Sequence, residues 1–439
     1  MEATAQPQRP EATAFGNLRI ILWILLFAAA AEFLARGPVR FLSWPAEWND
    51  LSQNYTASKL WLQGQSPADP ASFVALWKQQ VHSRLELSDV RTHLAPPLAG
   101  LVVIAPVAVF PWKIAKILWL VILLIAFGAT VWALSQVAGF RRDDLSTVAF
   151  VAASLALAPF QTGISTGNTT ILVIGLCAVA IWAAHTRRDI AAGILFGMAC
   201  SLKPQIGAFL VLYYLVSRRW RLFFTAVSTT IGLTVVAVVY LWLRGASWLQ
   251  GYLNNAKGFV SANNIDDFST ANPARFNLIN LQVPMFSMTR HSSSANLLAF
   301  AIGACLICAW LYLTLKANQR EPELLPLGAV SIIGLLPVYH RFYDAALLVV
   351  PLCWCMTRIV SRPNNISKIA LLLMLPFLVP GTAFLQQLGA RGQVSDAVTH
   401  SWWWDRIVMP HQTWTLLLLC LVLLYALRQD ASSPYQEKV

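Results

Sequence analysis

The sequence predicts an all-α integral membrane protein, a polytopic helical bundle of about twelve transmembrane helices with short amphipathic helices in its first external loop. Of 439 residues, 57% are hydrophobic and only 12% are charged, against about 25% charged in an average soluble domain. The apolar residues fall in blocks of about 17 to 27, which matches the roughly 20 residues that cross a hydrocarbon core about 30 Å thick. No block alternates apolar and polar residues, as the strands of a membrane barrel do.

The basic residues gather at the ends of the apolar blocks. The net charge of +12 could by itself indicate a nucleic-acid partner. Basic clusters at block ends instead orient transmembrane helices and meet anionic head groups. We therefore expect membrane lipids as partners and no nucleic acid. The clusters are Arg141 with Arg142, Arg187 with Arg188, and Arg218, Arg219 and Arg221.

Cysteine and acidic residues show no pattern of metal ligands. Nearly all of the seven cysteines lie inside apolar blocks. The C-x-x-C pair Cys305 and Cys308 has no accompanying histidine, so helix packing explains it best. The first loop contains no acidic cluster with metal-ligand spacing. We expect neither a metal nor another cofactor.

The N-terminal part of the chain predicts a tail and an anchor. Residues 1–16 are polar and rich in Pro, Ala, Gln and Glu, which predicts a disordered cytoplasmic tail. The apolar run that follows is predicted to be an uncleaved anchor, the first element of a single transmembrane domain over 17–427. Arg9 and Arg19 precede the run and favour a cytoplasmic N-terminus.

The first external loop is predicted over residues 38–93. Two runs in it, near 51–62 and 72–81, carry apolar residues at helical spacing. Helices of this kind lie flat on a membrane surface. Gly64 and Pro67 mark a turn between them.

The rest of the domain is predicted to cross the membrane repeatedly. By parity, the loops at 244–296 and 386–411 fall on the same external side as the first loop, and the tail at 428–439 is cytoplasmic. This describes a multi-pass protein of the plasma (inner) membrane with its active site facing the periplasm or exterior. The predicted further spans are 94–110, 113–137, 145–160, 169–185, 190–216, 221–243, 297–315, 324–338, 344–360, 369–385 and 411–427.

One feature conflicts with twelve complete crossings. The arginine pairs at 141 and 187 would then lie outside, against the usual excess of basic residues inside. If the blocks at 94–110 and 190–216 failed to cross, both pairs would move inside, and the topology from Trp220 onward would be unchanged. The block at 94–110 contains proline, and Lys203 and Pro204 interrupt the other. We favour the full count and keep this alternative.

Four segments carry motifs. Residues 50–67 read D-x4-Y-x-A-x6-G-x2-P, and residues 92–106 begin THLAPPL. Residues 193–221 contain SLKPQ and end in basic residues, and residues 335–352 contain YHRFYDAALLVVP. In this order they resemble motifs of the polyprenol-phosphate-mannose-dependent mannosyltransferases, which form glycosyltransferase family 87 (GT87, DUF2029) of the GT-C superfamily.

The resemblance implies a GT-C-type bundle with a glycosyltransferase activity. It implies an inverting transfer of a sugar, mannose or a related hexose, from a polyprenyl-phosphate donor to a lipid or glycan acceptor on the outer face. The chain departs from the family pattern at Gly167-Asn168-Thr169-Thr170, where the family often has G-Q-x-N, and the loops at 244–296 and 386–411 match no segment of it. A transporter or flippase of lipid-linked sugars is the alternative, because broken spans and buried charges also line substrate pathways.

Asp50 is the candidate catalytic base. It follows the exit of the first span, where a carboxylate can deprotonate an acceptor hydroxyl. One carboxylate suffices when phosphate leaves, whereas hydrolytic glycosidases use two. Helix capping is the simpler explanation of an aspartate at this position. Asp89 is the rival carboxylate, but a surface ion pair with neighbouring Arg91 explains it. Within the same motifs, Tyr55 and His93 are predicted to contact substrate.

Lys203 is a candidate ligand of the donor phosphate. It lies inside an apolar block and precedes Pro204, which breaks the helical hydrogen-bond ladder. An ionisable residue within the membrane is a functional candidate by default. If the block does not cross, a lysine that reaches the membrane boundary is the alternative.

The turn around Arg341 supplies the remaining charged candidates. Arg341 and His340 are predicted to hold the donor phosphate, and Tyr343 and Asp344 to contact substrate. Asp344 could also pair with Arg341 in a turn that only satisfies its own charges. Trp403 lies in a run of three tryptophans beside Asp405 and Arg406; it could stack on a sugar, although tryptophan is also a common interfacial anchor.

Overall fold

The computed structural model describes residues 10–45, 49–81, 97–141, 145–259, 264, 266–316, 323–361 and 364–432. Within these ranges the chain is all-helical, and the extended pairing is limited to an isolated antiparallel bridge between Leu278 and Arg341. Helix α1 (Pro10–Leu34) begins inside the tail that was predicted to be disordered. Proline fits the first turn of a helix, and the alanine and glutamate residues after it favour the helical state.

Six helices are long and apolar enough to cross a membrane, or up to eight if each of two bent pairs is one span. The chain is therefore a multi-pass membrane protein, but twelve crossings are not found among the described residues. The six are α1 continued through η1 (Ala35–Val39) and α2 (Arg40–Ser43), α6 (Trp112–Ala138), α12 (Trp220–Leu243), α15 (Ser292–Lys316), η5 (Phe342–Leu348) with α17 (Val349–Ser361), and α21 (His411–Ser432). The bent pairs are α7 (Leu145–Ala156) with α8 (Ala158–Ser165), and α18 (Asn365–Met374) and η6 (Leu375–Phe377) with α19 (Gly381–Ala390).

Five apolar helices are short. They have 11 to 16 residues, which corresponds to about 17 to 24 Å of rise, less than the roughly 30 Å of a hydrocarbon core. None of them crosses as an independent straight span of full length. They are α5 (Leu98–Ala108), α9 (Thr170–His185), α10 (Asp189–Leu202), α11 (Pro204–Val216) and α16 (Leu324–Leu335).

The block at 190–216 turns back instead of crossing. Arg219 forms an ion pair with Asp189, so the two ends of the block touch. At the other end the chain reverses after Lys203, and a Cβ atom built on Gly207 would lie 2.9 Å from the backbone nitrogen of Cys200. Helices α10 and α11 therefore form a re-entrant hairpin with Lys203 at its tip. The prediction that 190–216 crosses was wrong, because hydropathy measures polarity and not the direction of the chain.

Four of the short helices meet at one end of the bundle, where Asp189, Arg219 and Glu323 come together. We call it the basic end, because the arginine clusters at 187–188 and 218–221 belong to it. Arg219 lies 3.9 Å from Glu323, at the start of α16, and donates a hydrogen bond to the carbonyl of Ala184, in the last turn of α9. Helices α9, α10, α11 and α16 thus share this end, and their other ends lie inside the bundle. The arginine pair at 187 lies beside Arg219, so the alternative topology fits it better.

Helix α3 (Asp50–Leu62) covers the inner ends of these helices. The backbone N–H of Asp50 donates to the carbonyl of Thr166 at 2.7 Å. At its other end, Trp61 donates to the carbonyl of Ala237 at 3.1 Å, and Tyr240 donates to that of Leu62 at 2.8 Å. Most of α3 is buried, so other helices cover it, whereas a helix that only rests on a membrane surface would leave one face exposed. Its polar face is directed at other helices.

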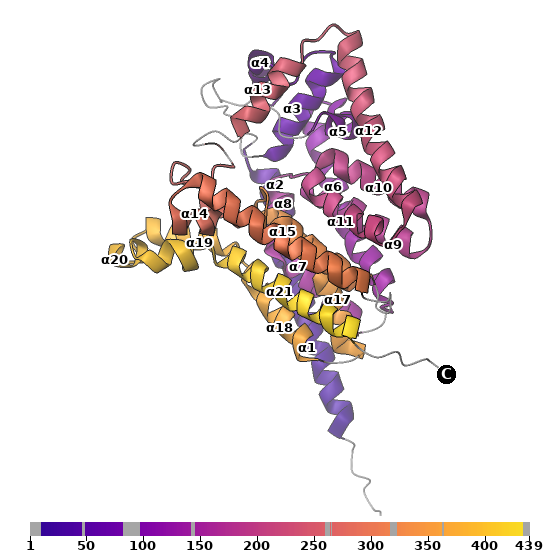
Figure 1. The fold of residues 1–439 in the computed structure, drawn as a ribbon, viewed down its shortest axis with the longest axis vertical. Coiled ribbons are helices and arrows are strands. Elements are labelled where there is room, and N and C mark those ends of the chain that lie inside the picture. The colour runs from indigo at the N-terminus through magenta and orange to yellow at the C-terminus, as the bar shows by residue number, and fades with distance from the viewer. Residues whose placement is uncertain are drawn as a thin grey trace, which may run out of the picture.

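The three long loops lie beside one another. Figure 1 shows α3, α4 (Pro70–Val81) and α13 (Leu249–Phe259) together at the top, away from the N-terminal end of α1. A Cβ atom on Gly251 of α13 would lie 3.3 Å from Ala68, which joins the first loop to the second. The second loop meets the third through Arg275 and Asp405, which are 2.9 Å apart. The parity of the predicted spans places the three loops on the same side, which agrees with this arrangement. That this side is the outer face of the membrane remains a prediction.

Candidate active site

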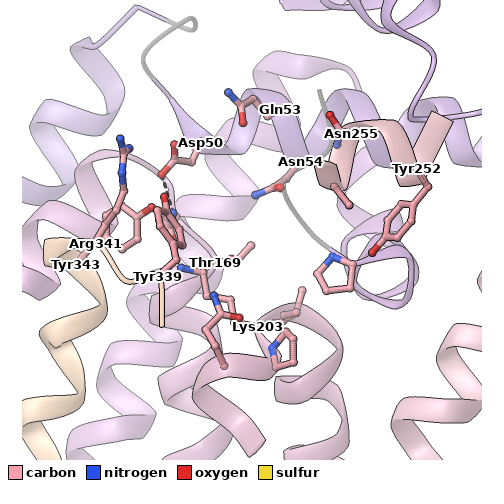
Figure 2. Close-up of a pocket in the computed structure, with 16 residues that line it drawn as sticks. Asp50, Gln53, Asn54, Thr169, Lys203, Tyr252, Asn255, Tyr339, Arg341 and Tyr343 are labelled. Carbon is pink, nitrogen blue, oxygen red and sulfur yellow. Dashed lines mark hydrogen bonds between the residues drawn. The ribbon is translucent and has the colours of Figure 1, made fainter. Parts of the chain in front are cut away.

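A pocket of about 280 Å³ lies where α3 meets the inner ends of the short helices. Figure 2 shows charged and aromatic side chains on one side of it, with Tyr252 and Asn255 of α13 on the other. The pocket brings together Asp50, Lys203, Arg341 and Tyr343, which three separate stretches of the sequence supply. Its walls are formed by Asp50, Gln53, Asn54, Pro97, Asn168, Thr169, Leu202, Lys203, Pro204, Gln205, Tyr252, Asn255, Ala256, Tyr339, Arg341 and Tyr343.

Asp50 is the first residue of α3, and a hydrogen bond fixes its carboxylate. Asn49 caps the helix by accepting from the N–H of Leu51 at 2.9 Å, so the cap role predicted as an alternative for Asp50 belongs to its neighbour. The side-chain amide of Asn168 donates to Oδ2 of Asp50 at 2.6 Å. Burial raises the pKa of Asp50 above its ordinary value, because a low-dielectric site disfavours the carboxylate. The hydrogen bond from Asn168 and the charges of Arg341 and Lys203 oppose this rise.

Lys203 stands at the tip of the re-entrant hairpin, paired with a carboxylate. Its Nζ lies 2.8 Å from Oδ1 of Asp344 and 2.6 Å from the hydroxyl of Thr170. It also lies over the ring of Tyr343, 4.7 Å from the centroid. Pro204 cannot donate a backbone hydrogen bond and starts α11, so the lysine occupies the break between two helices. Its side chain is 12% exposed and lines the pocket.

Asp344 is fully buried and is not a wall of the pocket, but it contacts residues that are. Besides Lys203, it lies 3.1 Å from Nδ1 of His340 and accepts the backbone N–H of Arg341 at 3.1 Å. The predicted pairing of Asp344 with Arg341 is therefore a backbone contact, and the charge partner is Lys203. His340 is fully buried and is not a wall of the pocket. The contact of its Nδ1 is to Asp344, behind the pocket.

Arg341 faces the pocket beside Asp50, Tyr339 and Tyr343 (Figure 2). Its Nε atom is buried and has no hydrogen-bond partner among the described residues. Arg341 also interacts with the side chain of Tyr343 and with the charge of Asp50. Its unpaired Nε still leaves it capacity for an anionic ligand. This supports the residue's predicted contact with the donor phosphate.

Helix N-termini surround the pocket. Its walls include the first residue of α3, the N-cap residues of α5 and α9, and the first residues of α11. The N-terminus of a helix carries unpaired N–H groups and a partial positive charge. The pocket therefore combines a carboxylate with a field that favours anions.

Two further predicted site residues lie outside the pocket walls, and a third is not among the described residues. Tyr55 is buried, donates from its hydroxyl to the carbonyl of Phe110 at 2.9 Å and packs on Trp112, so it braces α3. Trp403 is 37% exposed and is not a wall of the pocket. His93 lies outside the described residues, as does the rival Asp89. Tyr55 and Trp403 are thus not among the residues that the pocket brings together.

Several polar residues of the site were not predicted. Asn168 and Thr169 lie where the sequence departs from the family motif, and that departure was their signal. Gln53 and Asn54 follow Asp50 by one helical turn, while nothing in the sequence distinguishes α13. Among the described residues, no group of three or more His, Cys, Asp or Glu side chains could hold a metal ion.

A comparison with protein families gives one match. The model of glycosyltransferase family 87 matches residues 94–338, which include Asn168, Lys203 and α13 but not Asp50 or Asp344. No curated protein and no solved structure matches the chain.

Proposed function

The chain belongs to glycosyltransferase family 87, and from this we propose that it transfers a sugar from a polyprenyl-phosphate donor to a hydroxyl of a lipid or glycan acceptor. As a member of the family it is a membrane glycosyltransferase. The donor sugar, by resemblance mannose or a related hexose, and transfer on the outer face with inversion are part of the proposal. The observation that carries it is one pocket in which Asp50 faces Arg341 and Lys203.

The proposed reaction is a single displacement. Asp50 takes the proton of the acceptor hydroxyl while the hydroxyl oxygen attacks the anomeric carbon of the donor. The bond from this carbon to the phosphate oxygen breaks, and the polyprenyl phosphate leaves with the electron pair. Attack opposite the leaving group inverts the anomeric centre.

The charges of the pocket suit this displacement. The departing phosphate gains one negative charge as Asp50 loses its own by accepting the proton. Negative charge therefore moves from Asp50 toward the cations, with no change in the total. Arg341 and the surrounding helix N-termini stabilise the charge where it develops, and a preorganised field of this kind is often the largest contribution to catalysis.

A transporter or flippase of lipid-linked sugars is the other candidate. The family match gives it no support, since the family is one of transferases. The re-entrant hairpin, which could serve transport, has its tip lysine paired with buried Asp344. A fixed pair of this kind favours a rigid site over a moving gate.

The test is transfer of radiolabelled sugar by purified protein in lipid. The donors form a panel of polyprenyl-phosphate sugars, with a membrane lipid extract as the source of acceptor. We expect labelled product from a hexose donor, and Asp50→Asn should reduce its formation by about 10² or more, the scale of a lost general base. Asp50→Glu should recover little, because a displaced carboxylate loses its alignment. Movement of intact donor across vesicles without product would support the transporter instead, and a folded Asp50→Asn protein with near-normal transfer would remove Asp50 as the base.

A further inference from the structure

We propose that Asn168 is the positioning residue of Asp50. Its side-chain amide fixes the carboxylate, and Thr170 fixes the direction of that amide. The inference rests on the proposed function, in which Asp50 is the base. It assigns a role to the stretch where this chain departs from the motif of its family.

The hydrogen bonds of Asn168 permit one orientation of its amide. Oδ1 accepts the backbone N–H of Thr170 at 2.9 Å and lies 2.8 Å from the hydroxyl of Thr170. Since Oδ1 is used by a donor, the NH₂ group must point the other way, toward Oδ2 of Asp50 at 2.6 Å. Asn168 is 6% exposed, so water does not compete freely for these bonds. An amide held in this way presents a fixed donor to the carboxylate.

Thr170 extends this set of contacts to Lys203. Its hydroxyl accepts from Nζ of Lys203 at 2.6 Å and lies 2.5 Å from Oδ1 of Asp344. A continuous chain of polar contacts therefore runs from Asp50 through Asn168 and Thr170 to Asp344 and Lys203. The position of the base is set relative to the residue pair that lies at the tip of the re-entrant hairpin.

The role of Asn168 follows from what a base requires. With one oxygen of Asp50 bound to Asn168, the other is left for the acceptor hydroxyl. The amide also stabilises the ionised form, so Asp50 can stay charged although it is buried. The other titratable groups that act on Asp50 are Arg341, Lys203, Asp344, Tyr339 and Tyr343. All of them are kept in the variants below.

The decisive variant is Asn168→Asp. A carboxylate oxygen can still accept the N–H of Thr170, so the start of α9 keeps its hydrogen bond, but the amide donor is replaced by a second carboxyl group beside Asp50. Two adjacent carboxyl groups do not ionise independently, and one pKa rises strongly. We expect kcat to fall about tenfold or more and the acid limb of kcat/KM to move up by about one pH unit or more. The donor KM should change little.

Two further variants separate positioning from helix capping. Asn364→Asp is the matched control, because Asn364 caps α18 by accepting the N–H of Ser367 at 2.8 Å and is not a wall of the pocket. It should keep the wild-type pH profile. Asn168→Ser keeps an acceptor for the start of α9 but is too short to reach Asp50, and should lower kcat even if Asn168→Asp does not fold. Thermal unfolding in detergent checks folding of each variant.

The outcomes distinguish this proposal from the one on which it rests. If Asp50→Asn abolishes transfer while Asn168→Asp and Asn168→Ser keep the wild-type kcat and acid limb, Asp50 remains the base and the positioning role is wrong. If a folded Asp50→Asn protein transfers sugar normally, both assignments fall. A shift of the acid limb in Asn168→Asp, absent in Asn364→Asp, supports the role.

Discussion

The carboxylate of Asp50 is subject to opposing influences. Burial raises its pKa, and the amide of Asn168 and the cations of the pocket work against that rise. The direction that prevails is upward. A base whose pKa lies closer to the working pH accepts a proton more readily when the acceptor hydroxyl is deprotonated.

The pH dependence of activity should therefore show an acid limb above the ordinary aspartate value of about 4. In the proposed reaction transfer needs ionised Asp50, so kcat/KM should fall as the pH drops through the raised pKa. Stability changes in the opposite sense. The folded state binds the Asp50 proton more tightly than the unfolded state, so this contribution is present at low pH and is lost as the pH rises through the raised pKa.

Asp50→Asn removes the contribution of Asp50 to the pH dependence of stability, and so tests whether that contribution falls as the pH rises. Its melting temperature should match the wild type at low pH and equal or exceed it at pH 8, because no buried carboxylate remains to be charged. Thermal unfolding at several pH values measures this. A wild-type protein that gains stability over Asp50→Asn with rising pH would mean that Asp50 is stabilised, not destabilised, as an anion.

The pairing of Lys203 with Asp344 changes how the lysine should be tested. Lys203→Met leaves the fully buried Asp344 without its charge partner, which we expect to cost about 3–5 kcal/mol. The double variant Lys203→Met with Asp344→Asn should recover much of the stability. If the lysine also contacts the donor, the double variant should bind polyprenyl phosphate more weakly than wild type. Equal affinity would restrict Lys203 to a structural role and leave Arg341 as the phosphate ligand.

The re-entrant hairpin of α10 and α11 is the element that carries Lys203. The close approach of its two helices depends on Gly207, where a Cβ atom would lie 2.7 Å from Sγ and 2.9 Å from the backbone nitrogen of Cys200. The second contact is with backbone, so a side-chain rotation cannot relieve it. The position of the tip lysine thus depends on a residue one turn into the next helix.

Gly207→Ala should separate the two helices and displace Lys203. We expect a loss of about 1–3 kcal/mol, the usual cost of overpacking, together with weaker donor binding. Gly232→Ala in α12 is the control, since no atom lies within 4 Å of its added Cβ, and it should gain about 0.5–1 kcal/mol from helix propensity. Chemical or thermal unfolding compares the two. Similar stabilities would show that the hairpin tolerates a wider separation.

The sequence identifies those features that depend only on where polar residues interrupt apolar ones. Lys203 and Arg341 were identifiable because charges in apolar surroundings are rare, and Asp50 because it follows a span. Asn168 and Thr170 are neutral and common, so only the contacts reveal them. Whether 190–216 crosses depends on the ion pair between Asp189 and Arg219, a contact between residues 30 positions apart, which no hydropathy window detects.

At the scale of the whole molecule, these contacts decide the topology. The loop after α9 lies at the basic end, beside the start of α12, whereas the three long loops lie together elsewhere. This arrangement groups the arginine clusters at 187–188 and 218–221 at one end, as the positive-inside bias favours if that end is cytoplasmic. The predicted outer position of the pocket follows if the basic end is cytoplasmic.

Single cysteines at exposed positions test that orientation. In a background with Cys305 and Cys308, which are exposed, replaced by alanine, we would introduce cysteine at Gln65, Thr270 and Ser395 in the three loops and at Thr186 in the loop after α9. An impermeant thiol reagent should label the first three in intact cells, and Thr186→Cys only after permeabilisation. External labelling at Thr186→Cys would contradict the re-entrant hairpin.

The ring of helix N-termini around the pocket has a consequence for turnover. In the proposed reaction, the field of these N-termini attracts the polyprenyl phosphate product, a dianion, more strongly than the singly charged donor. The spent carrier lipid should therefore be the tightest natural ligand of the enzyme and a competitive inhibitor with respect to donor. Its departure, rather than sugar transfer, would then set the steady-state rate, visible as a burst of product in the first turnover. An enzyme of this kind works fastest where carrier lipid is recycled promptly, so its output reports on the supply of free carrier in the membrane.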